Sequence, residues 1–128
     1  MKIITTLSLL LLLTAGDSVE SFWQEFKTAV NKHDVEAIAS LSKFPLRMSY
    51  GIPSIKTKAQ LNKRYRQLFN EQTDAAKCFN KANPEVDLDN PKHFSVACPD
   101  AAGNQVVIYN FHLEPTGWKL TGMDNINE

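Results

Sequence analysis

The chain is poor in the residues that usually mark a chemical function. Its 128 residues include two cysteines and three histidines, and its 14 basic residues equal its 14 acidic ones. No histidine stands at metal-ligand spacing from another histidine, a cysteine or a carboxylate, whereas a zinc site needs three or four converging ligands. No catalytic motif or nucleotide-binding loop is present. Balanced charge argues against a nucleic-acid or membrane-surface protein, since both normally carry a basic excess. We therefore expect no metal, no cofactor and no nucleic-acid partner.

Long hydrophobic runs are also missing, with one exception at the N-terminus. Lys2 precedes an apolar run from Ile3 to Leu13, and the small residues that follow it suit a signal-peptidase site near Gly16. A helix of this length spans about 16 Å, which is too short for a hydrocarbon core of about 30 Å. We predict that residues 1–16 are a signal peptide and that the protein is exported to the periplasm or the cell exterior, without a membrane anchor. An uncleaved anchor or a buried first helix is the alternative interpretation.

Residues 17–128 have the common size of one domain and are too few for two good cores. In a chain that leaves the reducing cytosol, Cys78 and Cys98 are expected to form a disulfide. Their midpoint, Leu88, falls in a segment rich in proline and Asx residues, which predicts a turn with the two cysteines facing each other across a hairpin. Such a bridge would stabilise the fold by about 3 kcal/mol. A cysteine nucleophile is the alternative, although no histidine can be placed beside either cysteine.

Apolar residues at helical spacing predict three helices. The first runs from about Ser18 to Lys32, and Asp34 is placed to cap a second, shorter helix that reaches about Ser42. The third covers residues 57–70 and begins with a capping box, in which a threonine hydroxyl and the side chain of Gln60 satisfy free backbone donors.

Alternation and turn residues predict short strands in the remainder of the chain. Proline disfavours helix at the residue before it, so Pro45 ends the second helix. The predicted strands are Arg47–Tyr50, Ala76–Phe79, Lys92–Cys98, Gln105–Glu114 and Trp118–Met123. If the last two close as a simple hairpin, one face of them is apolar and comprises Val107, Tyr109, Phe111, Leu113, Trp118 and Leu120.

This order of elements resembles that of a known superfamily. The corner at residues 34–41, with the sequence DVEAIASL, and the closing strand at residues 117–120, GWKL, look like the nuclear-transport-factor-2-like (NTF2-like) superfamily, which includes ketosteroid isomerases and SnoaL-like cyclases. The resemblance covers nearly the whole chain after the signal peptide. It implies an α+β fold, a cone in which N-terminal helices pack on a curved antiparallel sheet. Because this fold hosts enzymes, ligand binders, dimerisation modules and immunity proteins, it implies no single activity.

The resemblance also implies a conical pocket between the helices and the concave face of the sheet. Aromatic residues on the inward faces of the predicted elements are candidates for the pocket lining, and a plain hydrophobic core is the alternative role for each of them. These candidates are Trp23, Phe26, Tyr50, Tyr65, Tyr109 and Phe111.

An isomerase-like or dehydratase-like enzyme would need a general base in that pocket and a donor for the developing oxyanion. Asp124 is the weak candidate for the base, because strand parity places it on the inward face. Tyr50, Tyr65 or Tyr109 could serve as the donor. A surface aspartate at the end of a strand is the alternative interpretation of Asp124.

Two surfaces are candidates for contact with other molecules. The outer face of the last hairpin carries Val106, Ile108 and Met123 among polar residues, and the resemblance implies a homodimer through this face. A basic cluster on the third helix could hold an acidic ligand, or could be an ordinary solvated face. It comprises Lys56, Lys58, Lys63, Arg64 and Arg66.

The sequence thus favours an exported, non-catalytic NTF2-like domain that binds a small apolar ligand or a protein partner. An immunity or inhibitor protein is one version of the second. An enzyme that uses a pocket acid is the alternative.

Overall fold

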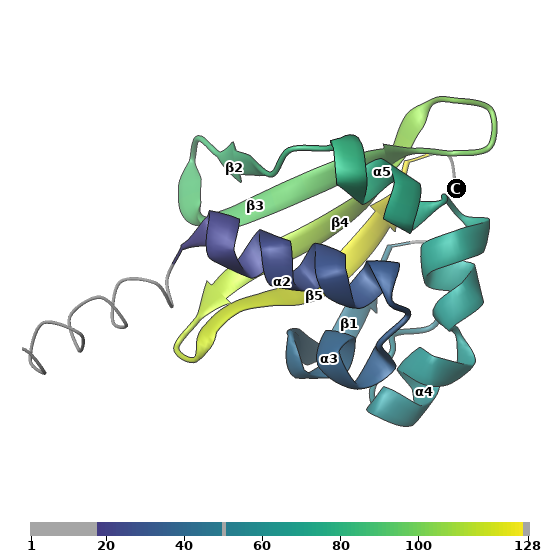
Figure 1. Cartoon of the computed structure of the whole chain (residues 1–128), viewed down its shortest axis with the longest axis horizontal. Helices are drawn as coiled ribbons and strands as arrows, with labels where there is room; N and C mark the ends of the chain where they lie inside the picture. The colour runs from purple at the N-terminus through teal and green to yellow at the C-terminus, as the bar shows by residue number, and fades with distance from the viewer. Residues whose placement is uncertain (1–17, 50, 127–128) are drawn as a thin grey trace, which may run out of the picture.

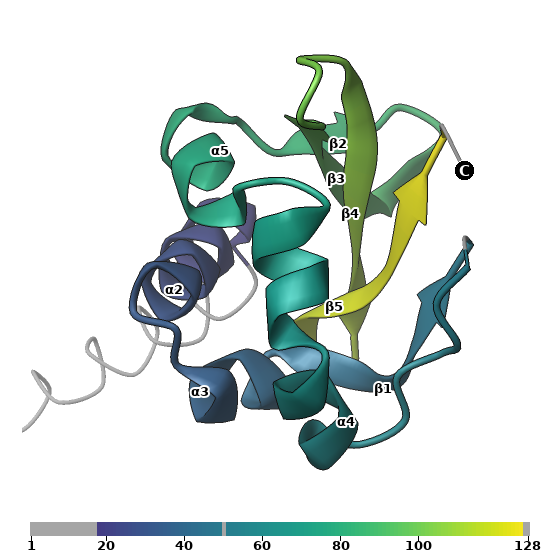
Figure 2. The same ribbon diagram turned by 90° about the vertical axis from the view of Figure 1, so that its right-hand side faces the viewer.

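The computed structural model describes residues 18–49 and 51–126. The predicted signal peptide at residues 1–16, its cleavage site and Tyr50 lie outside the described residues, so export and the role of Tyr50 stay predictions. The helices pack along one face of a five-stranded sheet, and no described helix covers the other face (Figures 1 and 2). This arrangement confirms the predicted α+β fold of N-terminal helices on a curved sheet.

Side-chain caps fix where the helices begin, and those at Asp34 and Thr57 were predicted. The hydroxyl of Ser18 accepts from the backbone N–H of Ser21, and Asp34 accepts from that of Ala37. Thr57 accepts from the N–H of Gln60, as expected. The helices are α2 (Val19–Asn31), α3 (Val35–Ser40), α4 (Lys58–Lys63), the π-helical segment η1 (Gln67–Glu71) and α5 (Ala75–Lys81).

Two predictions on the helices were wrong. The single helix expected over residues 57–70 is divided into α4 and η1, although its predicted apolar stripe remains buried. The strand expected at Ala76–Phe79 is helix α5. Here Asp74 accepts a hydrogen bond from the N–H of Lys77 at 3.2 Å and starts a helix whose Ala75 and Phe79, four residues apart, share the buried face.

The sheet has the strand order β1-β5-β4-β3-β2. From β5 to β3 the neighbours are antiparallel, as predicted; β2, which was not predicted, is also antiparallel to β3, whereas β1 pairs with β5 in parallel. The first strand begins at Ser42, five residues earlier than expected, because α3 ends at Ser40. The strands are β1 (Ser42–Met48), β2 (Glu85–Asp87), β3 (Asn90–Pro99), β4 (Gln105–Glu114) and β5 (Gly117–Asn125).

The β4–β5 hairpin contains one irregularity that changes which residues face inward. Leu113 pairs with Trp118 and Phe111 pairs with Leu120, as predicted, but Asn110 then pairs with Gly122, so Thr121 is an extra residue in β5. This β-bulge reverses the alternation of the residues that follow it.

The bulge overturns two predictions about β5. Met123, expected on the outer face, pairs with Tyr109 and is buried in the core. Asp124, expected on the inner face, pairs with Ile108 on the outer face. Simple alternation counted through Thr121 gave the wrong face for both residues.

Candidate functional site

The aromatic residues predicted to line an interior pocket lie together in the core. Five of the six are described, and each is at most 3% exposed. The ring of Phe26 meets that of Phe111 at a centroid distance of 5.1 Å, and Phe69 joins Tyr65 and Tyr109 at 4.8 and 5.6 Å. Ring-to-ring contacts of this length fill the space between helices and sheet, which supports the core interpretation of these residues.

The two described tyrosine hydroxyls have structural partners. Tyr109 donates to the backbone carbonyl of Leu68 at 2.6 Å, and Tyr65 donates to that of Val30 at 3.3 Å. Burial raises the pKa of Tyr65 to about 12, so its phenol stays neutral at physiological pH. Both hydroxyls therefore tie η1 and the α4–η1 segment to the rest of the core, a role the sequence pattern did not indicate.

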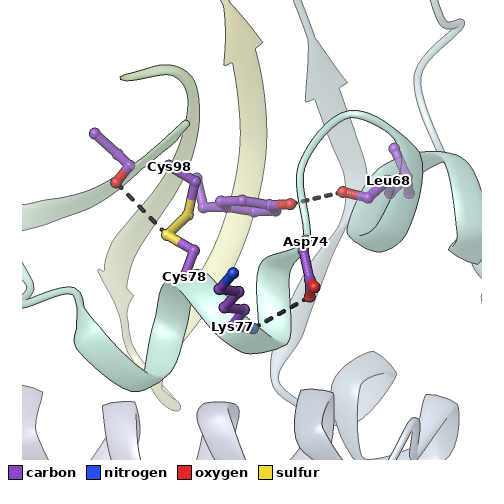
Figure 3. Close-up of a disulfide and its surroundings, with 7 residues drawn as sticks. Leu68, Asp74, Lys77, Cys78 and Cys98 are labelled. Atoms are coloured by element: carbon purple, nitrogen blue, oxygen red, sulfur yellow. Dashed lines mark hydrogen bonds between the residues drawn. A yellow bond between two sulfur atoms is a disulfide. The ribbon is translucent and has the colours of Figure 1, made fainter. Parts of the chain in front are cut away.

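A groove of about 560 Å³ lies at the surface, between α5 and the end of β3. Its volume falls in the range of ordinary ligand pockets. The disulfide between Cys78 on α5 and Cys98 on β3 joins its two walls, with a Cα–Cα distance of 5.8 Å (Figure 3). The groove is lined by Asn70, Glu71, Thr73, Asp74, Lys77, Cys78, Lys81, Ala82, Ala97, Pro99, Asp100 and Ala101.

The disulfide confirms the predicted pairing but not the predicted geometry. Cys78 lies on a helix and not on a strand of a hairpin, and its Sγ is 3.7 Å from the carbonyl oxygen of Ala97 (Figure 3). No free cysteine is present among the described residues. The bridge therefore fixes a helix against the sheet at the floor of the groove.

Charges of both signs line this groove, and they are separated along α5. Asp74 stands at the N-terminal end of the helix and Lys81 at its last residue, about 10 Å away at 1.5 Å per residue. Asp100 lies on the opposite wall, where its carboxylate accepts from two backbone N–H groups of its own turn. The ammonium groups of Lys77 and Lys81 make no ion pair within the part of the chain that the structure describes. The α5 wall of the groove thus has an acidic residue at its N-terminal end and a basic residue at its C-terminal end.

The other residues singled out by sequence lie apart from the groove. Asp124 is on the outer sheet face, where it accepts a hydrogen bond from Asn110. Several members of the predicted basic cluster have side-chain partners of their own: Lys58 pairs with Glu36, Arg66 pairs with Glu71, and Arg64 donates to Gln67. These contacts support the solvated-face interpretation of the cluster. The charges of the groove were missed, because they come from three separate segments.

Within residues 18–49 and 51–126, no group of three or more His, Cys, Asp or Glu side chains could hold a metal ion. In the same residues no helix is long and apolar enough to cross a membrane.

The fold and the groove define a small α+β protein with helices on one face of a curved sheet and an open cavity at its surface. The chain is similar to an NTF2-like protein with a cystatin-like fold from Novosphingobium aromaticivorans, at 13% identity, over 96% of this chain and 88% of that one, with a TM-score of 0.48. It is similar to a Mycobacterium tuberculosis protein in complex with estradiol-17β-hemisuccinate, at 12% identity over 80% and 87% of the two chains, TM-score 0.47. A proposed NTF2-like dehydratase from Streptomyces avermitilis is similar at 17% identity over 83% and 90%, TM-score 0.44. No family model and no curated protein matches the chain.

These solved structures include NTF2-like proteins, the superfamily that the sequence resembles. The likeness concerns the fold, and nothing about activity is taken from it.

Proposed function

We propose that this protein is an exported, non-catalytic binding domain, and that the groove beside the Cys78–Cys98 disulfide holds a peptide segment of a protein partner. The observation that carries this proposal is the groove itself. It has the volume of a ligand site, it is open at the surface, and charges of opposite sign stand at the two ends of its α5 wall.

The lining of the groove suits a peptide better than a wholly apolar ligand. Part of the lining is small and apolar, and the rest includes charged side chains. The small apolar residues are Ala82, Ala97, Pro99 and Ala101. A peptide with a basic group at one end and an acidic group at the other would meet Asp74 and Lys81 with opposite charges. Such complementarity gives specificity and orientation more than affinity.

The position of the acidic residues supports a binding role. The buried polar residues in the described part of the chain are Ser42, Thr73 and Asn125, so no carboxylate is buried among the aromatic rings there. Asp124, the weak candidate for a general base, is on the outer face of the sheet. The enzyme alternative required Asp124 as a general base inside the pocket, and Asp124 does not lie there.

Export rests on the apolar N-terminal run, and a disulfide is the bond expected in an oxidising compartment. The test is the mass of the intact protein recovered from a secreting host. We expect a chain that begins near Asp17. Uncleaved protein in the membrane fraction would contradict export in this form.

Binding is tested with short synthetic peptides that carry a basic and an acidic residue at opposite ends. We expect these peptides to shift the backbone amide NMR signals of residues 70–82 and 97–101, and all-acidic or all-basic peptides to shift them less. Lys81→Glu should weaken binding about fivefold. The substitution removes the exposed ion pair between Lys81 and the acidic end of the bound peptide and introduces repulsion there.

The matched control is Lys92→Glu, an exposed lysine on β3 outside the groove. It changes the net charge by the same amount and should leave the affinity unchanged. Equal losses in both variants would show a non-specific charge effect, and shifts confined to other residues would place binding elsewhere.

A further inference from the structure

A second polar site lies on the outer face of the sheet, which the described helices leave uncovered (Figure 2). A hollow of about 230 Å³ opens there, over β1, β3, β4 and β5. Its lining comprises Arg47, His93, Asn110, His112, Thr121, Gly122, Met123 and Asp124. The two histidines are direct cross-strand partners, and their rings stack at a centroid distance of 4.6 Å.

Hydrogen bonds fix the direction of Asn110. The amide nitrogen of Asn110 donates to a carboxylate oxygen of Asp124 at 3.0 Å, so its carbonyl oxygen is the atom that faces His93, also at 3.0 Å. The other ring nitrogen of His93 lies 3.4 Å from the carboxylate of Asp87, so this ring lies between two acceptors. The backbone N–H of Asp89, followed by the hydrogen bond from His93, lowers the pKa of Asp87.

The neighbouring ring, that of His112, is oriented by a hydrogen bond from Nδ1, which leaves Nε2 available as an acceptor. The single hydroxyl proton of Thr121 goes to the backbone carbonyl of Asn110 at 3.2 Å. Nδ1 of His112, 2.6 Å from the same hydroxyl oxygen, is therefore the donor in their hydrogen bond. Burial, followed by the electrostatic effect of the adjacent His93, lowers the pKa of His112, so at neutral pH its Nε2 carries a lone pair.

Three polar groups in the hollow have hydrogen-bonding capacity to spare within the part of the chain that the structure describes. Nε2 of His112 and Oδ1 of Asp124 make no hydrogen bond there, and both are acceptors. The guanidinium of Arg47 makes no hydrogen bond or ion pair there, and it is a donor. Asn110 and Thr121 hold the two acceptors in place, so the set is preorganised.

This mixture selects against simple ions. Arg47 would attract an anion, but Asp124 would repel it. Asp124 would attract a cation, but Arg47 would repel it. A neutral group that both donates and accepts satisfies all three, and an alcohol hydroxyl does both.

We propose that this hollow is a second binding site, which takes a neutral, hydroxyl-rich ligand of the class of a saccharide unit. Neighbouring hydroxyls donate to Nε2 of His112 and to the free oxygen of Asp124, while a hydroxyl or ring oxygen accepts from Arg47. The site lies on the opposite face of the sheet from the helices and does not depend on the groove beside the disulfide.

The pH dependence of binding follows from the acceptor role of His112. The titratable and charged groups around its ring are His93 on β3, Arg47 and Lys43 on β1, Glu114 on β4 and Asp124 on β5. Protonation of Nε2 turns the acceptor into a donor and adds a positive charge. Saccharide binding should therefore weaken as the pH falls through the lowered pKa of His112, whereas binding of an anion should strengthen.

The test is an NMR titration of the full protein with glucose and N-acetylglucosamine, and separately with inorganic phosphate, above and below the pH at which His112 titrates. We expect the saccharides to shift the His112 imidazole and Thr121 signals at the higher pH. Phosphate should shift them less there. Phosphate binding that exceeds saccharide binding and grows on acidification would overturn the proposal, as would the absence of any saccharide shift at these residues.

Three variants sharpen the result. His112→Phe keeps a ring against His93 but removes the acceptor, and Asp124→Asn removes the charge; each should weaken saccharide binding about fivefold. Ser95→Ala, on the same face but outside the hollow, should leave it unchanged. Circular dichroism checks that each variant folds. If the His112 variant does not fold, the Asp124 variant alone tests whether the saccharide binds in the hollow. Unchanged affinity in a folded Asp124→Asn variant would refute the assignment of its carboxylate.

Discussion

Replacing Gly122 by alanine tests the close approach of β1 and β5. A Cβ atom at this position would lie 2.5 Å from the backbone carbonyl oxygen of Arg47, 3.2 Å from its Cβ and 3.3 Å from its carbonyl carbon. The nearest of these atoms belong to the backbone of the paired strand, so no flexible side chain can swing away. To accept the methyl group, β1 must move from β5 at the point where the two strands pair in parallel.

The expected cost combines two terms of opposite sign. Overpacking that forces a backbone shift costs about 1–3 kcal/mol. Alanine also restricts the unfolded chain more than glycine does, which stabilises the protein by about 0.4–1 kcal/mol. We therefore expect Gly122→Ala to lower the free energy of unfolding by about 1–2 kcal/mol, as the difference of these terms.

Urea denaturation measures this change, and Gly51→Ala is the matched control. A Cβ atom at Gly51 would have nothing within 4 Å, so this variant should be as stable as the wild type or slightly more stable. If Gly122→Ala matched Gly51→Ala in stability, the tight parallel pairing of β1 with β5 would be refuted.

Three further changes test the covalent, packing and titration features of the fold. Replacing both Cys78 and Cys98 by alanine should lower the free energy of unfolding by about 3 kcal/mol, because their separation of 20 residues sets the loop entropy that the bridge removes; a urea melt that matches the wild type would contradict this. Trp118→Ala should cost about 3–5 kcal/mol, since the side chain is almost wholly buried, whereas Lys119→Ala on the opposite side should cost less than about 1 kcal/mol. A larger loss for the lysine variant would mean that the hairpin register is reversed. The pKa of Tyr65 rises from 10.0 to about 12 on folding, so its contribution to stability is complete below pH 10.0 and is lost as the pH rises toward about 12. Tyr65→Phe should weaken the alkaline loss of stability, and identical pH profiles would argue against burial as its cause.

Local signals in the sequence predicted the parts of the fold that local physics decides. Asp34 and Thr57 each cap a helix in the structure as predicted, because the hydrogen bond that makes a cap lies within four residues. The β4–β5 hairpin was likewise predictable near its turn, where Leu113 pairs with Trp118 and Phe111 with Leu120, but not beyond the bulge at Thr121.

The prediction failed where a short segment depends on its surroundings. The four residues from Ala76 to Phe79 suit a strand or a helix equally well, and the cap from Asp74 decided for the helix. The groove could not be predicted at all, because its walls come from η1, α5 and the end of β3, which meet only in the folded chain. The predicted Cys78–Cys98 disulfide lies beside the groove, but nothing in the sequence predicted the charged residues that line it.

The bulge at Thr121 has a consequence for how polar groups are distributed in this protein. If Thr121 instead paired regularly with Asn110, every later residue of β5 would exchange faces: Asp124 would turn into the aromatic interior and Met123 would turn to solvent. Deleting Thr121, by contrast, would remove the bulge and leave Met123 opposite Tyr109 and Asp124 opposite Ile108, on the faces they now occupy. In this strand the presence of the bulge, rather than the identity of an amino acid, determines whether an acidic group serves the inside or the outside of the molecule.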